Sequence, residues 1–252
     1  MNIGFLGSGH ITSSIIEGIF KSKIKIKKIF ISPRNKSISK KLSKRFKKVI
    51  VSNNNQQVID RSSWVFLAVT PNVGNKILKR LSFNKSKKVI SFISTININR
   101  LKKITKNRNV SRVIPLPFIG MRKGPIIICP KDNKLKNFFK HLGKVIELTS
   151  ENKSKSFWAT SSFMASFYNL LNETSSWLVS KGIKRNKAEN YTRELFLALS
   201  EDAMNKNKIS LKQLVLESQT PGGTNAYVLK ELKKKKFYKV QQKVLNSIFK
   251  KF

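Results

Sequence analysis

Residues 2–12 read NIGFLGSGHIT, and this stretch predicts the start of an α/β fold. An apolar strand over Asn2–Leu6 leads directly into two closely spaced glycines, and a helix-like segment over His10–Phe20 follows at once. Glycines let the backbone turn tightly and approach a pyrophosphate, and the new helix offers that anion free N–H groups and a positive dipole end. Thr12 stands where the dinucleotide pattern has its third glycine. We predict a dinucleotide-binding loop formed by Gly7, Ser8, Gly9, His10 and Ile11; the alternatives are a plain strand–helix turn and a solvated His10.

Short apolar runs alternate with helix-like segments through the first 150 residues. This alternation predicts an α/β domain over residues 1–150, with a parallel sheet and helices on both of its faces. The expected strands are Asn2–Leu6, Lys27–Ser32, Val49–Val51, Trp64–Val69, Lys88–Ile93, Ser111–Pro115, Pro125–Cys129 and Val145–Thr149. The expected helices are His10–Phe20, Ile38–Phe46, Val73–Leu81, Ile98–Ile104 and Leu135–Leu142.

Strand-like runs vanish after Ser150, which predicts a second, all-helical domain over residues 151–252. The expected helices cover 154–180, 186–205, 210–217 and 235–250. Long apolar helices on a domain of this size often bury their faces against a second copy, so we expect a homodimer or a higher homo-oligomer.

The chain carries 52 Lys and Arg residues against 12 Asp and Glu, a formal net charge of +40 over 252 residues. Such a charge is typical of nucleic-acid or anionic-surface binders. However, 42 of the 52 cations are lysines, they are spread along the chain, and they accompany 23 asparagines. Lys and Asn have A/T-rich codons, so we interpret the charge as compositional drift and expect neither a nucleic-acid nor a membrane partner.

The remaining composition argues for a cytoplasmic protein without a metal. Cys129 is the single cysteine, so no internal disulfide can form, and two histidines and one cysteine far apart cannot make a metal site. No apolar run approaches the roughly 18 residues of a membrane span, and the start of the chain lacks the features of a signal peptide.

The end of the second strand predicts which dinucleotide binds. Enzymes that prefer NAD usually place an acidic residue there to hold the ribose hydroxyls. Here the chain offers Ser32, Arg34 and Asn35 and no acid, a set that suits the 2′-phosphate of NADP. We therefore predict NADP, with NAD possible, since a generic basic loop would look the same.

Several motifs together resemble the pyrroline-5-carboxylate reductase family over essentially the whole chain. These are the glycine loop, Leu67-Ala68-Val69-Thr70-Pro71 where the family has Leu-Ala-Val-Lys-Pro, and Arg112-Val113-Ile114-Pro115 where it has Arg-Val-Met-Pro. The most specific match is Thr220-Pro221-Gly222-Gly223-Thr224-Asn225, where the family has Ser-Pro-Gly-Gly-Thr-Thr.

The resemblance implies a Rossmann NAD(P)-binding domain, a helical dimerisation domain and an NAD(P)H-dependent reduction of 1-pyrroline-5-carboxylate, or a related cyclic imine, to proline. It implies that Ala68, Val69, Thr70 and Pro71 contact the cofactor. It also implies that Thr220, Gly222, Gly223, Thr224 and Asn225 bind the substrate carboxylate, with Thr224 and Asn225 as the catalytic pair. The same segment also reads as a helix break followed by a Thr N-cap, and the two roles are compatible.

Polar positions of the family pattern are altered together in this chain. Asn225 replaces a Thr whose hydroxyl faces the substrate, and Thr70 replaces the Lys of Leu-Ala-Val-Lys-Pro. After Pro115 the family has Asn-Thr-Pro, but here Leu116-Pro117-Phe118 follows. The alternative to a reductase is therefore a non-catalytic nucleotide-binding paralogue.

Overall fold

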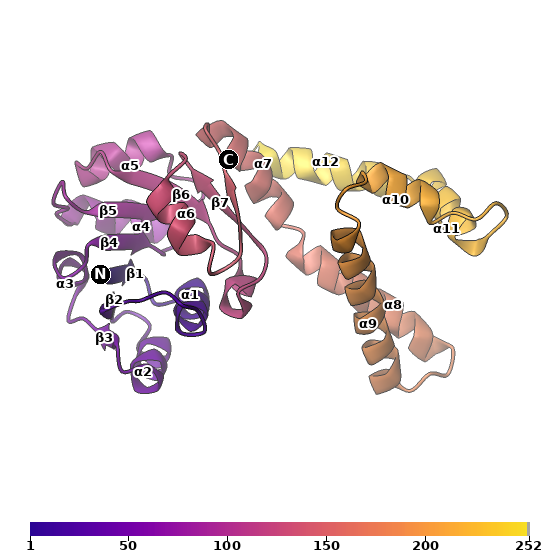
Figure 1. The fold of residues 1–252 in the computed structure, drawn as a ribbon, viewed down its shortest axis with the longest axis horizontal. Helices are drawn as coiled ribbons and strands as arrows, with labels where there is room; N and C mark the ends of the chain where they lie inside the picture. Colours follow the sequence, from indigo (N-terminus) through magenta and orange to yellow (C-terminus); the bar gives the residue numbers. More distant parts are fainter. Residues whose placement is uncertain (251–252) are drawn as a thin grey trace. The chain divides into compact units, whose positions relative to one another are not determined.

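A computed structural model describes residues 1–250 and divides them into two compact units, one ending at Trp158 and the other beginning at Ala159. The division lies within helix α7 (Glu151–Ser161), whereas the sequence predicts a boundary at residue 150. Figure 1 shows the two units along the chain, and each is described here by itself.

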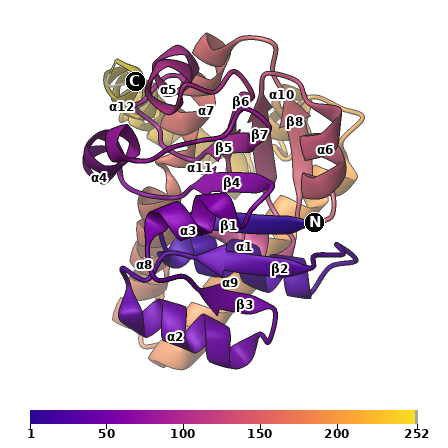
Figure 2. The same cartoon turned by 90° about the vertical axis from the view of Figure 1, so that its left-hand side faces the viewer.

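The first unit is built on one eight-stranded sheet with the order β3-β2-β1-β4-β5-β6-β7-β8, and Figure 2 shows β3, β2, β1, β4 and β5 one above the other. Its buried centre consists of β1, β4 and β5, in which Phe5 of β1 lies in register with Phe66 of β4. All eight expected strands are present, each within two residues of its expected bounds. They are β1 (Asn2–Leu6), β2 (Lys28–Ile31), β3 (Val49–Val51), β4 (Trp64–Leu67), β5 (Lys88–Ser91), β6 (Val110–Ile114), β7 (Pro125–Cys129) and β8 (Lys144–Glu147).

The sheet is parallel as expected except at one pair, because β6 and β7 run antiparallel. A parallel pair needs a crossover of a dozen or more residues, usually a helix. Only residues 115–124 connect these two strands, and they contain one short 3-10 helix, η2 (Pro117–Met121). The short connection therefore returns the chain in the opposite direction.

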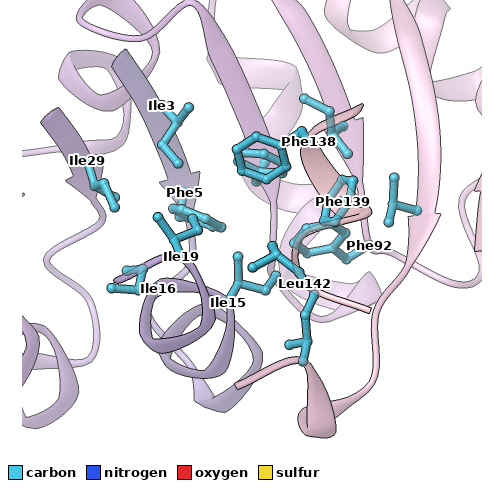
Figure 3. Packing of buried hydrophobic residues seen from close by; sticks show 14 of the residues in the cluster. Ile3, Phe5, Ile15, Ile16, Ile19, Ile29, Phe92, Phe138, Phe139 and Leu142 are labelled. Atoms are coloured by element: carbon cyan, nitrogen blue, oxygen red, sulfur yellow. The ribbon is translucent and has the colours of Figure 1, made fainter. Parts of the chain in front are cut away.

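Helices cover both faces of the sheet, and each face has its own buried cluster. On one face α1, α2 and α6 pack around Phe5 and Phe66, whose rings stack with centroids 4.7 Å apart. Figure 3 shows Phe5 of this cluster together with Ile15 and Ile16 of α1 and Phe138 and Phe139 of α6. On the other face α3, η1 and α5 pack around Val65 and Leu67. The helices are α1 (His10–Phe20), α2 (Lys36–Arg45), α3 (Asn55–Asp60), α4 (Pro71–Ile77), η1 (Leu78–Arg80), α5 (Ile98–Thr105) and α6 (Asn133–Phe139).

The second unit is entirely helical within the part of it that the structure describes. It contains α8 (Met164–Ser180), α9 (Arg185–Asn205), α10 (Leu211–Glu217), α11 (Thr224–Lys234) and α12 (Phe237–Phe249). Helices α8 and α9 pack against each other through small residues, with Ser175, Ala188 and Thr192 buried between them.

One helix of the sequence analysis is two helices in the structure. The expected helix over 154–180 is interrupted, because α7 ends at Ser161 and α8 begins at Met164. The break follows Thr160-Ser161-Ser162, three residues whose side-chain hydroxyls compete for backbone hydrogen bonds and so weaken a helix.

Candidate functional site

The two glycines of the first loop have different physical roles. Gly7 has φ +111°, and a Cβ there would lie 2.3 Å from the carbonyl oxygen of Ala68. Only glycine fits at that position. Gly9 has an ordinary φ of −89°, and a Cβ there would meet no atom within 4 Å. The open space at Gly9 adjoins the first turn of α1, whose N–H groups have no partner inside the helix, so the residues present fit a bound pyrophosphate.

Thr12, which replaces the third glycine, ties the loop to the helix. Its side chain is fully buried, and its hydroxyl donates a hydrogen bond to the carbonyl oxygen of Gly7 over 2.8 Å. The threonine therefore holds Gly7 in place rather than disrupting the loop.

The Ser32 hydroxyl links three segments at the ends of β1, β2 and β3. The N–H of Gly7 donates to it over 3.0 Å, and it lies 2.6 Å from Oδ1 of Asn55, to which it donates. Ser32 is 1% exposed. Ser32, predicted as a cofactor contact, thus already has a protein partner both as hydrogen-bond acceptor and as donor.

Two other predicted contacts, Ser8 and Asn35, bind each other. The backbone N–H of Asn35 donates to Oγ of Ser8 over 3.2 Å, while the Asn35 side chain caps α2 by accepting from the N–H of Ile38. The bond to Ser8 joins the loop after β1 to the loop after β2.

A cavity of about 360 Å³ opens beside these loops at the carboxyl ends of β1, β2 and β4. Of the predicted residues, Gly7, Ser32, Arg34 and Val69 line it. Five further lining residues were not predicted from the sequence, namely Asn55, Asn72, Val73, Lys76 and Ile77. Among the described residues, the lining does not include Ser8, Gly9, His10, Ile11, Asn35, Ala68, Thr70 or Pro71.

The missed residues belong to two helices that the sequence analysis did not place correctly. Asn55 opens α3, a six-residue helix that was not expected at all. Asn72 lies in the first turn of α4, which begins at Pro71 rather than at the expected Val73. Asn72 and Lys76 are four residues apart, and so are Val73 and Ile77, and residues at this spacing lie on the same face of a helix. This spacing was the signal in the sequence that could have placed them together.

The segment after β4 leads directly into α4. The N–H of Ala68 donates to the carbonyl oxygen of Leu6 over 2.8 Å, which fixes the end of β4 beside the glycine loop. Thr70 is the N-cap of α4 and Pro71 its first residue; the Thr70 side chain is exposed and makes no capping bond.

A buried cation holds the loop after β5. Arg112 of β6 is 3% exposed, and its guanidinium donates to the carbonyl oxygens of Ser94 and Ile96. It also lies 2.9 Å from a carboxylate oxygen of Glu151, which in turn accepts from the N–H of Ile98. Burial lowers the pKa of Arg112 below its ordinary value, and the Glu151 carboxylate opposes that shift. The sequence does not predict these contacts, because the residues meet only in the folded protein.

In the second unit, the Thr220–Gly223 segment forms a tight turn directly before α11. The N–H of Gly223 donates to the carbonyl oxygen of Thr220 over 2.9 Å, and Gly222 has φ +73°, as the third residue of a type II turn requires. Gly223 is the N-cap of α11, and Thr224 is its first residue. The turn therefore ends with unpaired helix N–H groups and an exposed threonine hydroxyl.

Asn225 uses its side chain within the same corner. Its amide nitrogen donates to the carbonyl oxygen of Ser218 over 3.2 Å, beside the end of α10. Thr224, in contrast, has no side-chain hydrogen bond to any residue within 1–250.

The described residues contain no group of three or more His, Cys, Asp or Glu that could hold a metal ion. Among these same residues, none of the helices combines the length and the apolarity that crossing a membrane requires. Cys129 is buried, and burial raises the pKa of its thiol.

Comparison with known proteins agrees with this two-part architecture. A family model described as NADP oxidoreductase, coenzyme F420-dependent, matches residues 2–97, and the model for pyrroline-5-carboxylate reductase dimerisation matches residues 152–252. The chain is also 28% identical over 134 residues to "Pyrroline-5-carboxylate reductase 3" of Danio rerio. That match spans 51% of this chain and 46%, about half, of the relative's length.

Solved structures share the fold over the whole chain. A 1-pyrroline-5-carboxylate reductase from Streptococcus pyogenes superposes with a TM-score of 0.86 at 21% identity, covering 100% of this chain and 97% of the other. A pyrroline carboxylate reductase from Plasmodium falciparum, solved with NADP bound, superposes with a TM-score of 0.83 at 20% identity, covering 100% and 96%. At these identities the likeness shows the fold alone.

The fold and its two glycine turns define a two-domain protein with a dinucleotide-type first domain and a helical second domain. One family model matches part of the first unit and another matches the second unit, and the chain's own motifs agree with them, so the chain is similar to pyrroline-5-carboxylate reductases in both of its units.

Proposed function

We propose that the chain is an NADPH-dependent reductase of 1-pyrroline-5-carboxylate or of a related cyclic imino acid. The observation that carries the proposal is the Thr220–Gly223 turn, which leaves the first turn of α11 and the Thr224 hydroxyl open in a unit that matches the reductase dimerisation domain. The glycine loop of the first unit supports it independently, because the space at Gly9 is open where a dinucleotide pyrophosphate would approach.

The first unit would hold NADP(H) through three groups of residues. The backbone N–H groups after Gly9 would bind the pyrophosphate, while Val69 and Arg34 would border the adenosine end. Ser32 and Asn55 would support that end, since the Ser32 hydroxyl donates to Oδ1 of Asn55 and accepts from the Gly7 N–H.

The second unit would hold the substrate carboxylate at the start of α11. Helix N–H groups and a positive dipole end favour an anion there, and Thr224 adds a hydroxyl donor. Bound NADPH would supply the hydride for the imine carbon, and the ring nitrogen would gain a proton, so that a secondary amine and NADP⁺ result.

The second unit would also join two copies of the chain. It exposes large apolar side chains, among them Trp177 at 60%, Tyr191 at 61%, Met204 at 71% and Leu211 at 72%. Burying such side chains is favourable, and a matching surface on a second copy would cover them. We expect a dimer or larger oligomer in sedimentation analysis; a monomer across micromolar concentrations would contradict this.

A second function, nucleotide binding without catalysis, is favoured by the position of Asn225. Its amide nitrogen is engaged by Ser218, and a carboxamide is a poor proton relay where the family has a hydroxyl. In that case the Thr220–Asn225 segment would serve only to begin α11.

The two functions separate in one experiment on the full-length protein. Oxidation of NADPH is followed by absorbance with 1-pyrroline-5-carboxylate and with a panel of cyclic imines, and NADPH affinity is measured in parallel by calorimetry. Imine-dependent oxidation supports the reductase. Cofactor binding with no turnover on any imine supports the non-catalytic function.

A further inference from the structure

The cavity beside the glycine loop has two cationic side chains that come from different elements. Arg34 follows β2, and Lys76 lies on α4. We propose that Lys76 and Arg34 together clamp the 2′-phosphate of NADP(H), so that α4 shares the selection of NADP over NAD. This inference rests on the proposed dinucleotide binding.

Helix α4 presents two parallel rows of side chains to the cavity. Asn72 and Lys76 form a polar row, and Val73 and Ile77 form an apolar row, each with the four-residue spacing of one helix face. Together with Val69, the apolar row suits the face of a purine ring, while the polar row ends in the Lys76 cation. An adenosine carrying a phosphate matches both rows.

The charge of the cavity is one-sided. Its lining contains two cations and no carboxylate. Neither Arg34 nor Lys76 has an ion pair or a side-chain hydrogen bond with any residue in the range 1–250, and both side chains are exposed. Lysines are abundant in this chain, so an exposed cation is not unusual by itself. Arg34 and Lys76 differ from the others because they line the same cavity.

The place of the cavity in the sheet favours the 2′-phosphate over the pyrophosphate. The pyrophosphate belongs at the start of α1, and the cavity lining reaches Gly7 but not Gly9 or the first residues of α1. The lining instead includes Ser32 and Asn55, at the ends of the second and third strands. In dinucleotide-binding sheets the adenosine ribose lies at the end of the second strand, where a cation accommodates its 2′-phosphate.

The test compares ligands that differ only in the 2′-phosphate. Affinities of the full-length protein for NADPH and NADH, and for 2′,5′-ADP and 5′-AMP, are measured at constant ionic strength for Arg34→Ala, Lys76→Met, Lys76→Arg and Lys79→Met. Lys79 is the matched control because it is exposed, lies on η1 one turn after Lys76, and does not line the cavity.

We expect Lys76→Met and Arg34→Ala each to weaken NADPH and 2′,5′-ADP about 3- to 30-fold, as for the loss of one charge-assisted contact. NADH and 5′-AMP should change less than about twofold, Lys76→Arg should restore most of the affinity, and Lys79→Met should match wild type. Equal losses for NADPH and NADH, or a Lys76→Met variant like Lys79→Met, would overturn the clamp.

The results also distinguish this inference from the proposed reductase. Preference for 2′,5′-ADP without turnover of any imine contradicts the reductase and leaves the clamp standing. Imine reduction with equal affinity for NADPH and NADH contradicts the clamp and leaves the reductase standing. A protein that binds none of the four ligands contradicts both.

Discussion

The hydroxyl of Thr12 donates to the carbonyl oxygen of Gly7 over 2.8 Å, and this bond joins the first helix to the loop that precedes it. In the dinucleotide pattern a glycine at this position lets helix and strand pack closely. Here a buried side chain occupies the position and supplies a donor. Thr12 thus departs from the glycine pattern, yet its hydrogen bond stabilises the loop that connects β1 to α1.

Replacing Thr12 with Val keeps the shape of the side chain but removes the donor. Because the Gly7 carbonyl then loses a buried partner, we expect the free energy of unfolding to fall by about 1–2 kcal/mol and NADPH binding to weaken. Urea denaturation and calorimetry measure the two effects. Thr12→Ser keeps the hydroxyl but lacks the methyl group, and it serves as the control; a loss in Thr12→Ser without a loss in Thr12→Val would show that the methyl group, not the hydrogen bond, matters.

The two loop glycines should respond oppositely to substitution. Gly9→Val should leave the fold intact at a cost below about 1 kcal/mol, because its side chain enters open space at a helix N-cap, yet it should weaken NADPH at least about 100-fold. Gly7→Ala should instead lower the free energy of unfolding by about 2 kcal/mol or more, because it combines a positive φ with a backbone clash. Unchanged NADPH affinity in Gly9→Val would remove the loop from the cofactor site.

Truncation should reveal the role of Glu151 in the first unit. A fragment of residues 1–158 retains the Glu151–Arg112 ion pair, whereas a fragment of residues 1–150 leaves the Arg112 charge buried without its carboxylate. Losing one partner of a buried pair costs about 3–5 kcal/mol, so the shorter fragment should be less stable by that order or fail to fold.

Glu151→Gln in the 1–158 fragment is the matched control for this truncation. It removes the carboxylate charge but keeps the rest of the first turns of α7. Thermal unfolding of the three fragments gives the comparison, and equal midpoints for all of them would contradict a stabilising role of the ion pair.

The turn before α11 can be tested at its two polar positions. If the chain is an active reductase, Thr224→Ala should raise the substrate KM about 5- to 100-fold with little change in NADPH affinity, as for a lost donor to a charged group. Steady-state kinetics with varied imine gives this result directly.

Asn225→Thr restores the residue that the family has at that position, and it also removes the bond to Ser218. Higher turnover on 1-pyrroline-5-carboxylate would mean that the amide impairs the reaction, and lower turnover on the native substrate would mean that it selects another imine. If both Thr224→Ala and Asn225→Thr match wild type on every imine, the turn only begins the helix.

Acid sensitivity should depend on Asp132, the N-cap of α6, which pairs with the buried Lys88. Burial alone would raise the pKa of Asp132, but the hydrogen bonds from Lys88 and from the N–H of Leu135 outweigh burial and hold it below its ordinary value. A carboxyl whose pKa is depressed in the folded state contributes stability above its unfolded pKa, near 4, and loses that contribution as the pH falls through its folded pKa.

The stability difference between wild type and Asp132→Asn should therefore be largest near neutral pH and shrink below about pH 4. Denaturation at several pH values measures it. Asp60→Asn, at an exposed carboxylate without an ion pair in the described part of the chain, is the control. A constant difference across the pH range would refute the linkage. Glu147, whose pKa is lowered by its hydrogen bond from Lys136, is present in both wild type and Asp132→Asn, so its titration is common to the two proteins.

The sheet could be predicted from the sequence because its strands are local patterns. The run over β4, rich in branched and aromatic residues, specifies a strand buried on both faces without reference to its neighbours. Helix α3 could not be predicted in the same way, because its six residues are too few to show a helical period. The antiparallel direction of β7 follows from the length of its connection to β6, which is too short for a helical crossover.

The sequence by itself determined the α/β first domain, the glycine loop, the helical second domain and the turn before α11, because each depends on residues that are close along the chain. Only the tertiary structure decided that Ser32 forms hydrogen bonds with Gly7 and Asn55 and that Arg112 forms an ion pair with Glu151. It also decided that Lys76 and Arg34 line the same cavity. These contacts join residues that lie far apart in the sequence. Side chains on different elements meet only after burial of the apolar faces has set the order of the strands, and no local pattern carries that information.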